Sequence, residues 1–160
     1  MKVLIAFNQW LNNISTKIAS LFLIAMILLS CGNIFLRMVW IPIKGTYELL
    51  GFFSAVVAGM ALGYAQLTDA HTSVDLLTMR YPVRLQKIVK AINHLVCSIF
   101  FAIGGWQVFL WANTLRSSGE VTETLRICYY PFAYILGVGC FILALTTFTQ
   151  LLTMFTKKVE

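Results

Sequence analysis

Two histidines are the residues of this sequence best suited to hold a cofactor. His71 and His94 each lie near the same end of an apolar run. Two histidines on facing helices can supply both axial ligands of a haem. Histidines near a membrane surface also serve as ordinary hydrogen-bonding groups, so this pair alone does not specify a haem. A cytochrome-like membrane anchor of a redox complex therefore stands as one alternative function.

The four cysteines suggest thiol chemistry only weakly. A membrane thiol oxidase uses a Cys-X-X-Cys pair, and the sequence contains no such pair. Cys31, Cys97 and Cys140 lie within apolar runs, and Cys128 lies at the edge of one. Cysteines in apolar surroundings act mainly as small packing residues. The cysteine positions therefore favour packing over redox chemistry.

Acidic residues are missing from the long apolar runs. Proton and ion relays inside a membrane usually need an ionisable side chain within a span, whereas the polar groups here are amides and hydroxyls. This chain is therefore not expected to be a self-sufficient ion-coupled transporter, and a structural subunit fits better. We also expect no enzymatic activity, no metal site and no cofactor. A stand-alone small transporter is the second, less favoured alternative.

Composition indicates which elements hold these residues. The chain of 160 residues is 59% hydrophobic and 11% charged, whereas soluble domains contain about 25% charged residues. The basic residues are too few to follow a phosphate backbone, which excludes a nucleic-acid-binding protein. About 20 apolar residues in a helix cross a hydrocarbon core of about 30 Å. The sequence therefore predicts an all-α integral membrane protein with short loops and a single domain, residues 1–160, with spans at about 18–36, 49–68, 91–115 and 130–155.

The segment before the first span is predicted to be an interfacial amphipathic helix. Val3, Phe7, Trp10 and Ile14 share one helical face, while the asparagines lie elsewhere. A frayed tail is the alternative. The residues around Cys31 resemble a bacterial lipoprotein cleavage site, but the apolar run continues beyond them, as it would in an uncut span.

The basic residues predict the orientation of the chain. Eight lysines and arginines lie on the side that holds both termini, and four lie on the other side. By the positive-inside rule both termini are cytoplasmic. The cytoplasmic segment that leads into the third span is predicted to be amphipathic and to contact anionic headgroups through Arg80, Arg84, Lys87 and Lys90.

Small residues recur along the second span. Gly51, Ala55, Gly59 and Gly63 are spaced four residues apart. Such a stripe lets two helix backbones approach closely. We expect it to face another helix, either in this chain or in a partner.

A charged pair is the other candidate for packing between spans. Arg37 ends the first span and Glu48 begins the second. A pair between them would fix the register of the two helices. Alternatively, both side chains reach to water.

Three local patterns, in this order on four spans, carry a resemblance to a known family. The first is Arg37 followed by Gly45 and Glu48. The second is His71 followed by Val74-Asp75-Leu76-Leu77, and the third is Gly119-Glu120-Val121-Thr122 with Thr124-Leu125 and Pro131. From about Lys17 to Phe155 the chain resembles the small, DctQ-like membrane subunit of tripartite ATP-independent periplasmic (TRAP) transporters.

The resemblance implies a small permease subunit of the bacterial inner membrane. Its partners would be a large M-type membrane subunit, which holds the sodium sites and moves substrate by an elevator motion, and a P-type periplasmic substrate-binding protein. The transported solute would be an organic acid, such as sialic acid or a C4-dicarboxylate. The small subunit would widen the scaffold and add part of the periplasmic docking surface, for which the outer loops offer Arg37, Lys44, Arg116, Glu120, Glu123 and Arg126.

Overall fold

Four long helices make up the fold. The computed structural model describes residues 2–68 and 83–156. Its helices are α1 (Lys2–Val39), α2 (Thr46–Leu67), α4 (Val83–Ser118) and α5 (Tyr130–Thr156). Each contains an apolar segment long enough to cross a membrane. The all-α membrane fold with four spans is thus confirmed.

Local sequence explains where the helices begin and end at the connections. Gly45 adopts a left-handed conformation (φ +75) directly before α2. Gly119 (φ +66) follows α4, and its N–H donates to the carbonyl of Leu115 at 3.1 Å, a common way to end a helix. Pro131 lies in the first turn of α5, where a missing N–H costs nothing.

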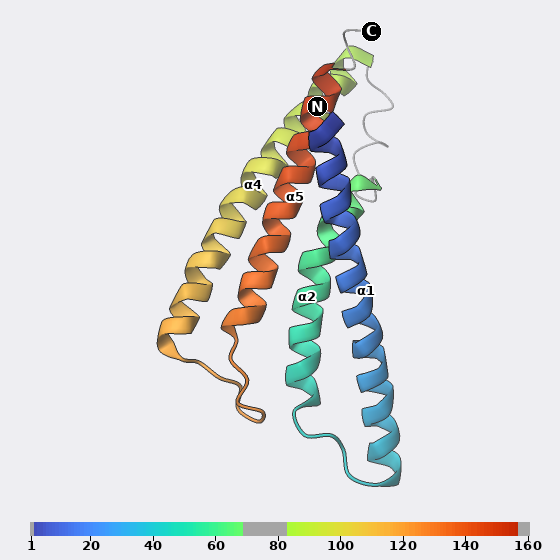
Figure 1. The fold of residues 1–160 in the computed structure, drawn as a ribbon, viewed down its shortest axis with the longest axis vertical. Coiled ribbons are helices and arrows are strands. Elements are labelled where there is room, and N and C mark those ends of the chain that lie inside the picture. The colour runs from blue at the N-terminus through green and yellow to red at the C-terminus, as the bar shows by residue number, and fades with distance from the viewer. Residues whose placement is uncertain (1, 69–82, 157–160) are drawn as a thin grey trace.

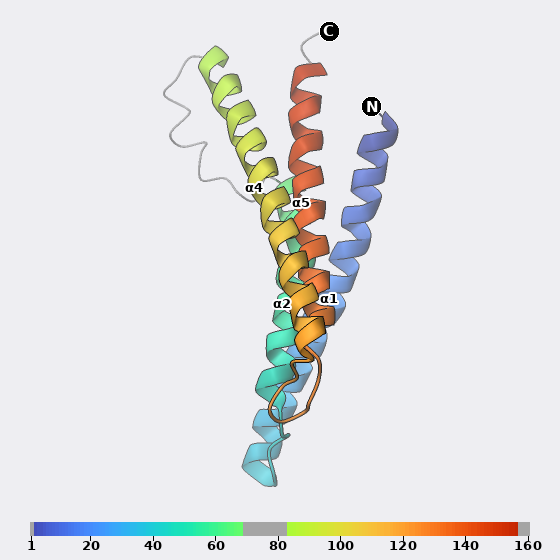
Figure 2. The ribbon, with the colours of Figure 1, turned by 90° about the vertical axis from the view of Figure 1, so that its left-hand side faces the viewer.

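The helices form a row rather than a closed bundle. α5 lies between α4 and α2, and α1 packs on the other side of α2 while touching α5 (Figure 1). In consequence, half of the most apolar window of α5 is buried, against 6% for α1 and 11% for α4. The helices spread at one end in Figure 1 and at the other end in Figure 2, so the row is twisted.

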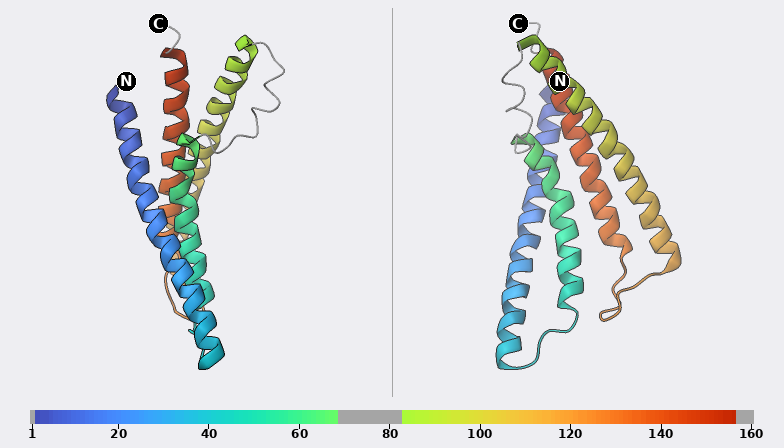
Figure 3. Two further views of the ribbon diagram at one scale, coloured as in Figure 1. Left: turned by 90° about the vertical axis from the view of Figure 1, so that its right-hand side faces the viewer. Right: turned by 180° about the vertical axis from the view of Figure 1, so that it is seen from behind.

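The two ends of the row differ in what they carry. α1 begins and α5 ends at one end, which we call the termini end (Figures 1 and 3). The α1–α2 and α4–α5 connections lie at the opposite end, which we call the loop end. The α1–α2 hairpin extends farther in this direction than the α4–α5 hairpin.

Two helices extend beyond the predicted spans. The first 17 residues are helical, as predicted for the segment that leads into the first span, and they belong to α1, which runs without a break for 38 residues, about 57 Å. The segment leading into the third span is likewise continuous with it, as one helix of 36 residues. The other two helices begin and end within three residues of the predicted spans.

Glycines allow the closest helix contact at the middle of the row. A Cβ on Gly139 of α5 would lie 2.8 Å from the Cα of Gly59 and still closer to its carbonyl group. The backbones of α2 and α5 therefore touch here, which only glycine permits.

Candidate functional site

The two loop-end connections are joined by Glu48. Its carboxylate oxygens accept hydrogen bonds from the backbone N–H groups of Thr124 (2.7 Å) and Leu125 (3.0 Å). Glu48 lies in the first turn of α2, and the two N–H groups belong to the α4–α5 loop. Hydrogen bonds to an ionised carboxylate are stronger than neutral ones, so this residue fastens one loop to the other.

A second contact seats the same loop on the first. The side chain of Leu125 occupies the space beside Gly45, where a Cβ would lie 2.7 Å from its Cδ1. The neighbouring Thr46 is buried, and its hydroxyl donates to the carbonyl of Ile43 at 2.7 Å. Gly45 is therefore required both for its left-handed conformation and for its lack of a side chain.

The α4–α5 loop is also ordered internally. Thr122, 2% exposed, donates its N–H to the carbonyl of Ile127 and accepts the N–H of Ile127 on its hydroxyl. Val121 and Cys128 form an isolated antiparallel bridge next to this pair. The loop is thus a small closed structure held against α2. Gly45, Glu48, Thr122 and Leu125, which belong to separate sequence patterns, meet at this one place.

The Arg37–Glu48 pair proposed from the sequence is not formed. Arg37 is exposed in the last turn of α1, and the carboxylate of Glu48 is turned to the α4–α5 loop instead. The two backbone N–H groups have no other partner in that loop and offer the carboxylate a nearer and better-directed contact. All six charged residues suggested for docking are exposed at the loop end: Arg37, Lys44, Arg116, Glu120, Glu123 and Arg126.

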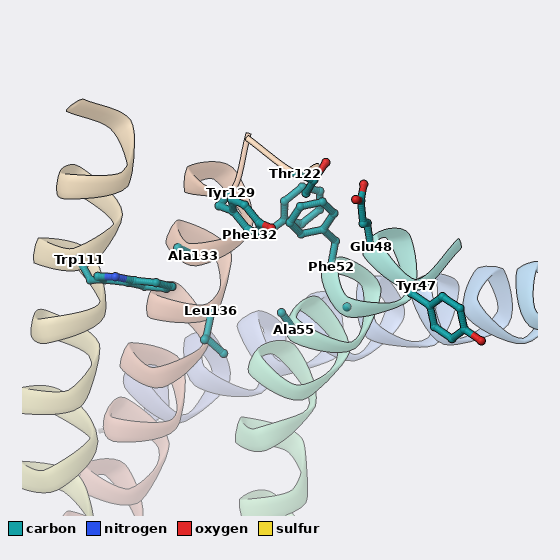
Figure 4. A pocket seen from close by; sticks show the side chains of 11 residues that line it. Tyr47, Glu48, Phe52, Ala55, Trp111, Thr122, Tyr129, Phe132, Ala133 and Leu136 are labelled. Atoms are coloured by element: carbon teal, nitrogen blue, oxygen red, sulfur yellow. The ribbon is translucent and has the colours of Figure 1, made fainter. Parts of the chain in front are cut away.

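An apolar groove of about 400 Å³ lies directly beneath the joined loops, between α2 and the α4–α5 pair (Figure 4). The Phe52 ring of α2 stacks on Phe132 of α5 with ring centroids 4.1 Å apart and meets Tyr129 edge-on at 5.4 Å, so aromatic contacts link the two sides of the groove. Trp111 extends from α4 along the wall opposite α2. The lining residues are Tyr47, Glu48, Gly51, Phe52, Ala55, Trp111, Thr122, Tyr129, Phe132, Ala133 and Leu136.

The small-residue stripe of α2 divides into two halves. Gly59 packs on Leu136 of α5, and Gly63 packs on Asn12 of α1 and Ile142 of α5. Gly51 has no neighbour within 4 Å of its Cβ position, and Ala55 lines the groove. One half is therefore used within the chain, and the half nearer the loops is open.

A buried polar cluster near the termini end was missed by sequence reasoning. The Asn12 amide donates to the Thr146 hydroxyl of α5 and to the side-chain oxygen of Asn8, each at 3.0 Å. Asn8, Asn12 and Ser15 are at most 3% exposed, while Phe7 and Trp10 are 54% and 59% exposed. The predicted amphipathic pattern exists, but its polar face is the one that packs inward. The clue in the sequence was the recurrence of polar residues at helical spacing.

Several residues considered as cofactor ligands or predicted to contact headgroups lie in or beside the part of the chain that the structure does not describe. His71, Arg80 and the turn around them lie outside the described residues, as does the side chain of Arg84. Lys87 is exposed near the termini end, and Lys90 is partly buried there. Across residues 2–68 and 83–156 no three metal-binding side chains lie together, and all four cysteines are unpaired.

Comparison with known proteins gives one family. Searches among curated proteins and among solved structures found no match. The family described as "Tripartite ATP-independent periplasmic transporters, DctQ component" matches residues 26–157, which include all the joined-loop contacts described above. This multi-pass membrane chain therefore belongs to the DctQ component family of the tripartite ATP-independent periplasmic transporters.

Proposed function

We propose that this chain braces a larger, sodium-coupled membrane subunit and helps a periplasmic substrate-binding protein dock during uptake of an organic acid. Family membership supports a role as one component of a tripartite transporter. The observation that carries the finer proposal is the Glu48 contact, which makes one continuous surface from two separate loops.

The bracing role is supported by the open architecture. A row of helices leaves broad apolar faces that need lipid or protein to cover them, and α1 and α4 are largely exposed in their apolar windows. Gly51 and Ala55 form the part of the small-residue stripe left free by internal packing. We propose that this part faces a helix of the large subunit, because small residues let membrane helices approach closely.

The docking role is supported by charge and order at the loop end. The loop end presents Arg116 in the last turn of α4, and the ordered α4–α5 loop presents Glu120, Glu123 and Arg126 to solvent. Charges at the rim of an interface chiefly set encounter rate and orientation. A pre-ordered loop also avoids an entropy cost on binding.

The proposed orientation places the loop end in the periplasm and the termini end in the cytoplasm, within the bacterial inner membrane. The exposed Lys87 near the start of α4 agrees with the positive-inside rule. On this proposal the sodium sites belong to the large subunit, because the spans of this chain contain no acidic residue.

Co-purification tests the bracing proposal. The chain is expressed together with a candidate large membrane subunit, and the retained partner is measured after affinity capture. Gly51→Leu should release the large subunit, while Gly32→Leu, at another glycine with open space around it, should retain it. At neither position does an added Cβ meet another atom within 4 Å. Full retention by Gly51→Leu would exclude this face as the contact.

Uptake by the assembled transporter tests the proposed role in sodium-coupled transport of an organic acid. Membranes with all three components are supplied with labelled sialic acid, C4-dicarboxylates or keto acids, with and without sodium. Accumulation that needs sodium and all three components supports the proposal. Accumulation by this chain alone in vesicles would contradict it and favour a stand-alone transporter.

A further inference from the structure

We propose that the tip of the α1–α2 hairpin, residues 37–44, lies among lipid headgroups rather than projecting into water, so that the chain crosses the membrane obliquely with α1 tilted. The lipid surface is the partner of this tip. This inference rests on the register of the helices and on exposed side chains, and it does not depend on the proposed function.

Two contacts fix the register of α1 against α2. The Phe22 ring packs on Phe53 with centroids 5.3 Å apart, and Asn12 lies against Gly63. Because the two helices run antiparallel, residues at the same level have numbers with a constant sum, and both contacts give a sum of 75. By the same relation Glu48 is level with residue 27 of α1.

The α1–α2 hairpin therefore extends well beyond the level of the joined loops. Arg37 lies ten residues past the level of Glu48, which is about 15 Å along a helix. The α4–α5 loop is held at the level of Glu48 by its hydrogen bonds. Figure 1 shows the same stagger, with the α1–α2 connection lying beyond the α4–α5 connection.

If α2 stood along the membrane normal, this stagger would place several side chains unfavourably. The tip would stand in water with Met38, Trp40 and Ile41 exposed by 83%, 78% and 63%, although large exposed apolar patches usually mark an interaction surface. At the same time Lys17, which is exposed, would be level with residue 58, near the middle of α2. A lysine facing lipid at that depth is unfavourable.

A moderate tilt of the chain reduces both conflicts. The charge-free run of α1, Ile18–Leu36, is about 29 Å long, so Lys17 and Arg37 reach opposite headgroup layers by extending their long side chains. Membrane helices tilt by about 20° on average. The N-terminal part of α1 continues along the same axis beyond Lys17, with Phe7 and Trp10 exposed.

The charges and residue types of the tip favour lipid headgroups as its partner. Arg37 and Lys44 flank it, and it contains no acidic residue. Glu48, the nearest acid along the chain, is bound to the other loop. Basic residues beside an exposed tryptophan match the phosphates and the interfacial layer of a bilayer. On this proposal the docking of a soluble protein rests mainly on the α4–α5 loop.

Spin-label depth measurements test the proposal on the full chain. The four cysteines are replaced by alanine, single labels are attached at Trp40→Cys, Lys17→Cys and Ser118→Cys, and the chain is reconstituted in vesicles of phosphatidylethanolamine and phosphatidylglycerol. Collision rates are measured with oxygen, which concentrates in lipid, and with a water-soluble nickel complex. Ser118 is the matched loop-end control, because it is exposed on the α4–α5 side.

The expected result is a headgroup depth for the labels at 17 and 40, with the label at 118 favouring nickel. Three results would overturn the proposal. These are nickel access at 40 equal to that at 118, shielding at 40 from both reagents, as a protein cover would give, or a greater depth at 17 than at 40. If the cysteine-free chain does not fold, native fluorescence replaces the labels. The emission lost in Trp40→Phe should be quenched by brominated lipid rather than by aqueous iodide, and the reverse would refute the proposal.

Discussion

Replacing Gly139 by alanine should separate α2 from α5. The new Cβ would lie 2.8 Å from the Cα of Gly59, whereas ordinary contacts begin near 3.4 Å, so the helices must move apart by at least 0.6 Å. The opposing atoms are backbone and cannot turn aside. Overpacking costs about 1–3 kcal/mol, and the higher helix propensity of alanine returns up to about 1 kcal/mol. Because three backbone atoms of Gly59 are overlapped, we expect the upper part of that range, about 2–3 kcal/mol, and hence a net loss of about 1–2 kcal/mol.

A matched control separates steric overlap from helix propensity. Gly104 lies within α4 with nothing within 4 Å of its Cβ position, so Gly104→Ala should be neutral or slightly stabilising. Thermal unfolding of the purified chain in detergent, followed by tryptophan fluorescence, compares the two variants with the parent. A loss of about 1–2 kcal/mol corresponds to a melting point lower by several degrees. Equal melting points for the two variants would refute the close approach of α2 and α5.

Three further predictions concern the loops and the buried cluster. Glu48→Gln keeps the shape of the side chain but weakens its bonds to the α4–α5 loop, so limited proteolysis of that loop should be faster; an unchanged rate would argue against the contact. Asn12→Leu and Thr146→Val should each destabilise the chain, and the double variant should lose less than their sum, with a coupling of about 0.6 kcal/mol in thermal unfolding, whereas strict additivity would remove the interhelical bond. Arg116→Glu should slow binding of the periplasmic protein to reconstituted membrane subunits, more so at low salt, with Lys87→Glu at the other end as a control that should bind normally.

The spans could be predicted because charges mark their limits. A charged side chain is costly in hydrocarbon and cheap at its edge, so the gap before Asp69 gave the end of α2 to within two residues. The same rule marks the start of the first apolar run but not the start of the first helix, because the backbone hydrogen bonds of α1 continue through Lys17 without a break.

Contacts between residues far apart in the sequence could not be predicted from local patterns. Glu48 is 76 residues from its partner Thr124, and either Arg37 or a loop N–H was chemically reasonable. The choice depends on how close α2 and the α4–α5 loop lie once α5 is packed beside α2, which residue spacing does not specify. The small-residue stripe was ambiguous for the same reason. Its spacing identifies a face, and only the neighbours of Gly59 and Gly51 show which part is occupied.

The distribution of polar groups explains why such a chain suits a subunit better than an independent protein. Its buried polar residues, such as Asn12 and Thr146, bond to one another between helices, while its apolar side chains cover the exterior. Lipid cannot supply hydrogen bonds, so polar groups give specificity inside and leave the outer faces open to lipid or to another apolar surface. A closed four-helix bundle would use most of its surface on itself. A twisted row buries chiefly α5 and keeps two broad faces, so one can lie against a partner while the other remains in lipid.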